Sequence, residues 1–99
     1  MNNNQIQLET RHLDIVKDIL AKYPYQFYAY GSRTKGVAKP YSDLDLCYFA
    51  DIPKKDIMVI KDEFSESRLP IFVELVNWNK MRSGFQENIE KDLLLISND

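Results

Sequence analysis

The feature that most constrains the fold is the stretch Tyr28–Phe49, YAYGSRTKGVAKPYSDLDLCYF, which joins a glycine-serine turn to two closely spaced aspartates. The aromatic segment Gln26–Tyr30 predicts a short strand that is buried on at least one face. It ends at Gly31-Ser32, where a glycine permits a positive φ angle and lets backbone come close to a ligand. The polar segment Arg33–Gly36 predicts one turn of helix closed by its glycine.

A strand-to-helix turn of this kind is a candidate anion site. Its backbone N–H groups point outward and bind groups such as phosphate. The hydroxyl of Ser32 adds a donor, and Arg33 and Lys35 add positive charge. The alternative is an ordinary turn at the end of a strand, because short glycine motifs also occur by chance.

Two aspartates follow on the next predicted strand, Asp43–Phe49, after a loop broken at Pro40. Side chains alternate along a strand, so Asp43 and Asp45 share one face, with their backbones roughly 7 Å apart. Two carboxylates placed in this way repel each other unless a cation lies between them. Their oxygens suit Mg²⁺, which keeps several waters and is completed by substrate phosphates. The alternative is a solvated edge strand that carries two acids.

Together these residues resemble a known family. Gly31-Ser32-x-x-x-Gly36 followed by Ser42-Asp43-x-Asp45-Leu46 is similar to the signature of nucleotidyltransferases with a DNA polymerase beta-like fold. The short chain resembles the minimal, MNT-type branch of that superfamily. The resemblance covers about residues 10–92. It implies an α/β (α+β) fold, with a small mixed sheet and flanking helices.

A third acidic residue is expected on the strand predicted over Ile71–Trp78. An unpaired charge within an apolar strand is costly, so Glu74 should face a metal, a basic partner or solvent. In the family this position is usually an aspartate, and here it is Glu74. The longer side chain either binds metal or acts as the base for the acceptor hydroxyl, or it marks reduced activity. A surface or salt-bridged glutamate is the structural alternative.

Composition limits the other possibilities. A length of 99 residues predicts a single domain, and the resemblance implies that it is a nucleotidyltransferase domain over residues 1–99, with its core at about 10–92. The net charge of −2 offers no basic field for nonspecific nucleic-acid binding, which argues against a stand-alone polymerase. No apolar run approaches the length of a membrane span, and the polar start is not a signal peptide. A lone cysteine, Cys47, also suits a cytoplasmic protein.

Helices are expected on either side of the aspartate strand. The first, Arg11–Lys22, is predicted to be capped by Thr10. In the second, over the charged segment Lys54–Glu66, Pro53 fits the first turn and Asp51 or a neighbour can cap the helix. Its inward stripe is Ile57, Ile60 and Phe64.

The C-terminal part gives a weaker pattern. A short helix capped by Asn79 is interrupted by Gly84, and helix resumes at Phe85. The apolar segment 93–96 is either a final element docked on the sheet or a partner-binding surface. Trp78 is expected in the core or at its rim.

The resemblance implies transfer of AMP from ATP to a hydroxyl group. Asp43 and Asp45, completed by Glu74, would hold two Mg²⁺ ions, which activate the acceptor and stabilise the leaving pyrophosphate. The phosphates would be bound by Gly31, Ser32, Arg33 and Lys35, with Ser42 orienting the loop or contacting phosphate.

The same resemblance implies the partner. In the MNT branch this is a HEPN toxin, and the acceptor is one of its tyrosines, so the chain would act as an antitoxin of a type VII-like system. Little of the chain is left to bury a base and sugar. The acceptor surface must therefore come from a partner or a second copy, in a hetero- or homo-oligomer.

Two other functions remain open. One is nucleotidylation of a small molecule, although drug-modifying members of the superfamily usually carry an extra helical domain. The other is an inactive binding antitoxin that blocks its partner by contact alone, which Glu74 in place of aspartate favours.

Overall fold

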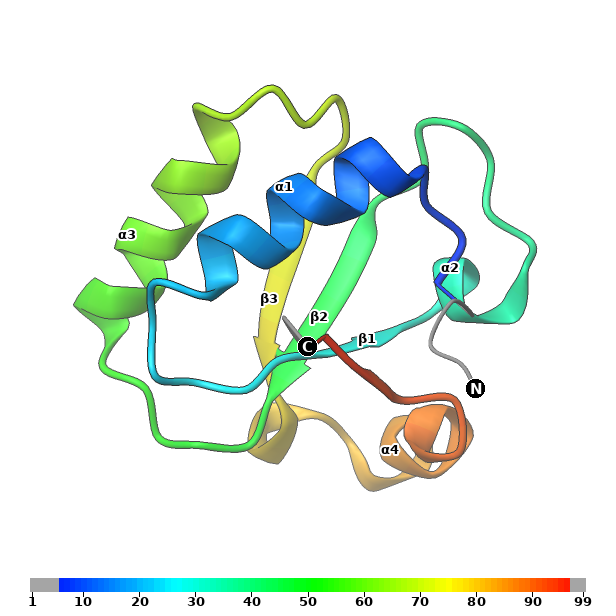
Figure 1. Cartoon of the computed structure of the whole chain (residues 1–99). Helices are drawn as coiled ribbons and strands as arrows, with labels where there is room; N and C mark the ends of the chain where they lie inside the picture. The colour runs from blue at the N-terminus through cyan, green and yellow to red at the C-terminus, as the bar shows by residue number, and fades with distance from the viewer. Residues whose placement is uncertain (1–5, 97–99) are drawn as a thin grey trace.

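Four strands form one mixed sheet in the computed structural model, which describes residues 6–96. The strands are β1 (Tyr28–Tyr30), β2 (Leu44–Tyr48), β3 (Val73–Asn77) and β4 (Leu94–Leu95), and their order in the sheet is β3-β2-β1-β4 (Figure 1). β2 and β3 run parallel, whereas β1 is antiparallel to both β2 and β4. The predicted small mixed α/β sheet is confirmed.

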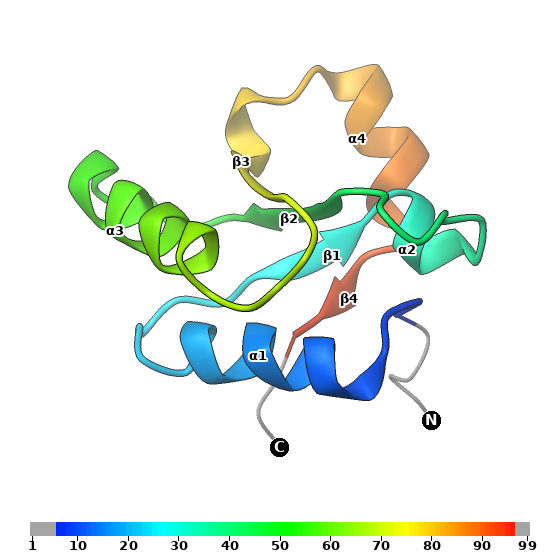
Figure 2. The same ribbon diagram turned by 90° about the horizontal axis from the view of Figure 1, so that it is seen from above.

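Helices cover the two faces unequally. α1 (Thr10–Leu20) and α3 (Lys54–Ser65) contribute to one large core, while α4 (Ser83–Glu90) lies across the opposite face (Figure 2). α2 (Ser32–Lys35) follows directly on β1, and the short 3-10 helix η2 (Trp78–Lys80) follows on β3. α3 is the crossover between the two parallel strands, as parallel pairing requires.

Alternation along β2 assigns its residues to the two faces. Leu44 and Leu46 are fully buried in the large core, together with Ile60 of α3. Cys47 belongs instead to a smaller cluster with Tyr30 and Ile89, on the α4 side. Because side chains alternate, Asp45 lies on the same face as Cys47.

The helix ends differ from those expected. Thr10 is the first residue of α1 and not its cap; Glu9 occupies the cap position without a side-chain hydrogen bond. Pro53 is likewise the cap residue of α3. Asn77 caps η2 by accepting a hydrogen bond from the backbone N–H of Asn79, so the predicted cap lay two residues too late.

Gly84 does not interrupt a helix, as the sequence predicted. It lies in the first turn of α4. There the helix needs no intrahelical partner for its N–H groups, so the cost of glycine is small.

The apolar C-terminal segment is docked on the sheet. β4 pairs with β1, and the backbone N–H of Ile96 donates to the carbonyl of Phe27 at 2.9 Å. Trp78 lies at the rim, with its ring centroid 4.9 Å from that of Phe49. The structural interpretations of both features are confirmed. No helix within residues 6–96 is long and apolar enough to cross a membrane.

The buried stripe of α3 provides a stability test. Ile60→Ala should lower the free energy of unfolding by about 2–5 kcal/mol, because it leaves a cavity where the side chain is 0% exposed. Urea denaturation measures this value. The control is Met58→Ala on the same helix, where the side chain is 58% exposed and the change should be under about 1 kcal/mol. Equal losses in the two variants would contradict the packing described here.

Candidate active site

A row of three side chains crosses the sheet on the α4 face. Tyr30 of β1 is the register partner of Asp45 in β2, and Glu74 of β3 is the partner of Asp45 on the other side. Register partners point to the same face, and neighbouring strands lie about 4.7–4.9 Å apart. The sheet therefore places Glu74 directly beside Asp45, as neither strand alone could.

Asp43 lies just before the row. It precedes the first residue of β2 and is exposed, as is Glu74, while Asp45 between them is half-buried. Asp43 and Asp45 are two positions apart, so in an extended chain both point to the same side. The three acids are thus carried by the start of β2 and by the neighbouring strand.

The surroundings of Asp45 change the pKa of its carboxyl group. Its pKa is raised to about 6, first by burial and then by the negative charges of Glu74 and Asp43. The hydroxyl of Tyr30 has a pKa raised to about 12, first by burial and then by Asp45. Both shifts come first from burial, and the acidic groups gathered at one place on the sheet add to them.

The glycine turn lies against this carboxyl group. Gly31 has φ 88° and ψ −153°, a region that is essentially closed to other residues. A Cβ atom at this position would lie 2.8 Å from Oδ2 of Asp45. The turn therefore approaches Asp45 more closely than any side-chain-bearing residue allows.

Ser32 begins α2, and Gly36 ends it in the left-handed conformation, with φ 75°. The predicted turn of helix closed by Gly36 is confirmed. Lys35, in the last turn, is exposed to solvent.

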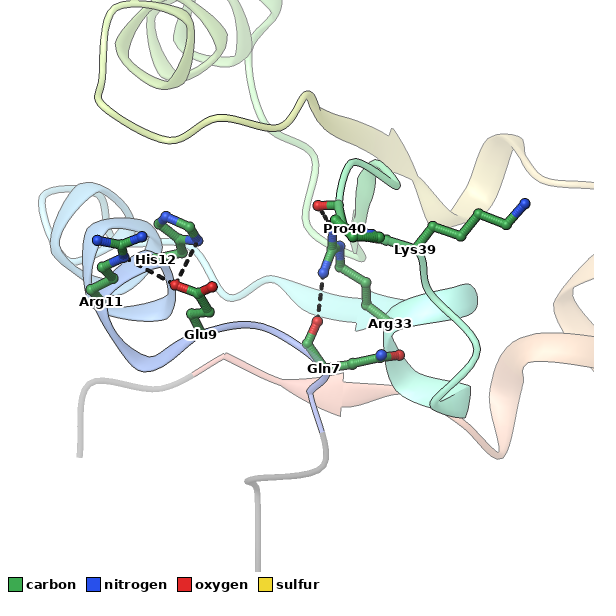
Figure 3. Close-up of polar contacts among 7 residues, drawn as sticks. All are labelled: Gln7, Glu9, Arg11, His12, Arg33, Lys39 and Pro40. Atoms are coloured by element: carbon green, nitrogen blue, oxygen red, sulfur yellow. Dashed lines mark hydrogen bonds and ion pairs between the residues drawn. The ribbon is translucent and has the colours of Figure 1, made fainter.

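Arg33 makes contacts that the sequence did not indicate. Its side chain is only 5% exposed, and its guanidinium donates to the backbone carbonyls of Gln7, Lys39 and Pro40, residues that Figure 3 draws around it. It also donates to the carbonyl of Ser42. The Ser42 hydroxyl accepts a hydrogen bond from the backbone N–H of Lys39 at 2.9 Å. The side chains of Arg33 and Ser42 thus both hold the 37–43 loop. The contacts of Arg33 with this loop differ from the phosphate contact that the sequence analysis expected.

The carboxylates of Asp43, Asp45 and Glu74 suit a divalent cation, although they are not close enough to form a metal site without it. Within residues 6–96, no three His, Cys, Asp or Glu side chains are close enough to form a ready metal cluster. The pKa of Asp45 is nevertheless raised, first by burial and then by the charges of Glu74 and Asp43, and a bound cation would relieve both effects. Carboxylate oxygens from Asp43, Asp45 and Glu74 are the ligands that Mg²⁺ accepts.

Comparison with known proteins identifies the family. Residues 14–99 match the family described as polymerase beta, nucleotidyltransferase. The chain belongs to this family. The nucleotidyltransferase predicted from the turn and the paired aspartates is thereby confirmed.

Two individual proteins are similar to this nucleotidyltransferase. The probable protein adenylyltransferase MntA of Haemophilus influenzae is 40% identical over 97 residues, covering 93% of this chain and 84% of that protein. The crystal structure of a candidate nucleotidyltransferase from Sulfolobus solfataricus is 22% identical, with a TM-score of 0.49, and the match covers 86% of this chain and 78% of that one.

Two contacts of the site could not be predicted from the sequence. The position of Tyr30 beside Asp45 depends on how β1 pairs with β2, and no local pattern reports that register. The bond from Arg33 to Gln7 joins residues 26 positions apart. Nothing in the sequence marks Arg33 as buried, and arginine side chains are usually exposed.

A pair of glycine variants tests the close approach. Gly31→Ala and Gly36→Ala should each cost roughly 1–3 kcal/mol of stability from backbone strain at positive φ. Only Gly31→Ala also pushes on Asp45, because a Cβ atom at Gly36 would meet nothing within 4 Å. Thermal unfolding should therefore show the larger loss for Gly31→Ala, and nucleotidyl transfer should fall further there than in Gly36→Ala. Equal losses of activity would contradict the contact with Asp45.

The raised pKa of Asp45 gives a pH test. Its folded value of about 6 exceeds the ordinary 3.8, so its contribution to stability is fully present below pH 3.8 and is lost as pH rises through about 6. Asp45→Asn should remove this decline and stabilise the metal-free protein at neutral pH. Denaturant unfolding between pH 4 and 7 measures it. The exposed Asp62→Asn serves as the control and should leave the slope unchanged.

Proposed function

We propose that this nucleotidyltransferase transfers AMP from ATP to a hydroxyl group of a protein. The observation that carries the proposal is the row of Asp45 and Glu74, with Asp43 ahead of it and the Gly31 turn against it. The similarity to a probable protein adenylyltransferase supports a protein as the acceptor.

In this proposal the acids hold divalent metal. Asp43 and Asp45 supply carboxylate oxygens, with Glu74 either completing the acceptor-side ligands or remaining free as a base. Bound Mg²⁺ would screen the charge of the triphosphate and polarise its phosphorus. The half-buried setting of Asp45 favours its role as a ligand, because a cation lowers the cost of its charge.

The remaining residues bind and orient. Gly31 and Ser32 present backbone N–H groups and a hydroxyl to the β- and γ-phosphates, and the exposed Lys35 supplies positive charge. The acceptor oxygen forms a bond to the α-phosphorus while the bond from that phosphorus to the bridging oxygen breaks. Pyrophosphate leaves, and the hydroxyl proton passes to the carboxylate of Glu74 when this residue is the base.

The acceptor that best fits the MNT-type resemblance is a tyrosine of a cognate HEPN toxin, which would be silenced by the added AMP. The chain would then be the antitoxin of a type VII-like system. An acceptor bound from outside accords with the exposure of Asp43 and Glu74, which leaves the acids accessible to another protein.

The deciding experiment is intact-mass spectrometry of the co-expressed neighbouring protein after incubation with this protein, ATP and Mg²⁺. The acceptor should gain one or more AMP units. Asp43→Asn Asp45→Asn should abolish the gain, because it removes both ligand charges while leaving the complex intact. The matched control is Asp18→Asn Asp62→Asn, which makes the same charge change at two exposed helical positions and should retain activity.

An inactive binding antitoxin is the second candidate. It is favoured by Glu74 in place of the usual aspartate, and by the lack of a ready three-acid cluster within the described residues. A tight complex with no mass gain would support it. No gain and no complex would direct the search to small-molecule acceptors.

A further inference from the structure

The side chain of Arg33 is enclosed by backbone carbonyl groups. Its Nε and Nη2 atoms both donate to the carbonyl of Ser42, at 3.1 and 2.8 Å. Nη1 donates to Gln7 at 2.6 Å, and Nη2 also reaches Lys39 and Pro40 at 3.3 and 3.1 Å. Burial lowers the pKa of Arg33, and the charge of Asp43 opposes that fall. The charge is therefore compensated mainly by carbonyl dipoles converging on one planar group, a geometry that suits arginine and not lysine.

Gln7 closes the same arrangement from the other side. Its backbone N–H donates to the carbonyl of Arg33 at 2.6 Å. Its side-chain amide pairs with the backbone of Ala38: Oε1 accepts from the N–H at 2.8 Å, and Nε2 donates to the carbonyl at 3.2 Å. We call Arg33 and Gln7 the clamp. It holds the start of the 37–43 loop through Ala38 and its end through Ser42 (Figure 3 shows both clamp residues).

The end of the loop is where the clamp meets the site. The carbonyl of Ser42 belongs to the peptide group that leads into Asp43, so fixing this oxygen fixes the plane from which Asp43 projects. Sheet hydrogen bonding begins only at the next residue, where the N–H of Leu44 donates to the carbonyl of Phe72 at 2.9 Å. Asp43 is itself exposed and lies outside β2. Its backbone is thus held by Arg33 on one side and by the sheet on the other.

We propose that Arg33, supported by Gln7, is a positioning residue that holds Asp43 in the geometry needed to bind a divalent cation beside Asp45. The inference rests on the proposed function for the use made of that cation. Arg33 then supports the 37–43 loop that leads to Asp43 and does not bind the triphosphate.

The test compares Arg33→Lys and Gln7→Ala with the control Arg11→Lys, whose parent side chain is 78% exposed and pairs with Glu9. Mn²⁺ alone is titrated by electron paramagnetic resonance, and amide hydrogen exchange is followed over residues 37–43. Arg33→Lys should bind Mn²⁺ about 10-fold more weakly or worse, as when other supports of metal ligands are removed. Exchange in the loop should quicken, while α1 and α3 keep their protection. Gln7→Ala should show both effects to a smaller degree, and Arg11→Lys neither.

Several outcomes would overturn the inference. A loop that exchanges faster with unchanged Mn²⁺ affinity would leave Arg33 a purely structural residue. Failure of the wild-type protein to bind Mn²⁺ would remove the site to be positioned. If Arg33→Lys does not fold, Gln7→Ala decides, since Gln7 is exposed and its loss leaves no buried charge unpaired. Neither readout needs ATP or an acceptor. Weakened Mn²⁺ binding in a protein that transfers no AMP would therefore reject the proposed function and support this inference.

Discussion

The charge of the half-buried Asp45 is the constraint on which the candidate site depends. An acid in the second strand of a four-stranded sheet is partly removed from water, and it has Glu74 beside it and Asp43 close by. Such a group is costly unless a proton or a cation compensates its charge. The three carboxyl groups therefore favour binding of a positive charge beside Asp45. In the proposed function, a divalent cation would supply that positive charge.

The two faces of the sheet divide the work of folding and function. α1 and α3 bury one face in the large core, which contains the fully buried Leu44, Leu46 and Ile60. On the other face, the described residues form a small buried cluster in which Ile89 of α4 packs with Tyr30 and Cys47. Stability therefore comes mainly from one side of β2, and the acids occupy the side that packing leaves accessible. Alternation along a single strand separates the two roles by one residue.

Local patterns predicted the elements better than their ends. The stripe of Ile57, Ile60 and Phe64 identified α3, and all three are buried. The caps were less predictable: Thr10 and Asn79 have suitable side chains, yet each lies one or two residues inside the segment it was expected to cap. Gly84 likewise lies within α4, where packing of Ile89 on the sheet outweighs a weak local preference. Helix ends depend on where tertiary contacts begin, and these are not encoded within a few residues.

The sequence by itself determined the pairing of Asp43 with Asp45 and the glycine at position 31, because strand alternation and a positive φ angle are local properties. It also indicated the family, since those features occur together at a specific spacing. Only the tertiary structure decided that Glu74 is the register partner of Asp45, that Gly31 faces its carboxyl group, and that Arg33 binds carbonyls of the loop. These contacts join residues up to 29 positions apart, from Asp45 to Glu74. Their geometry follows from sheet register and burial, which exist only once the chain has folded.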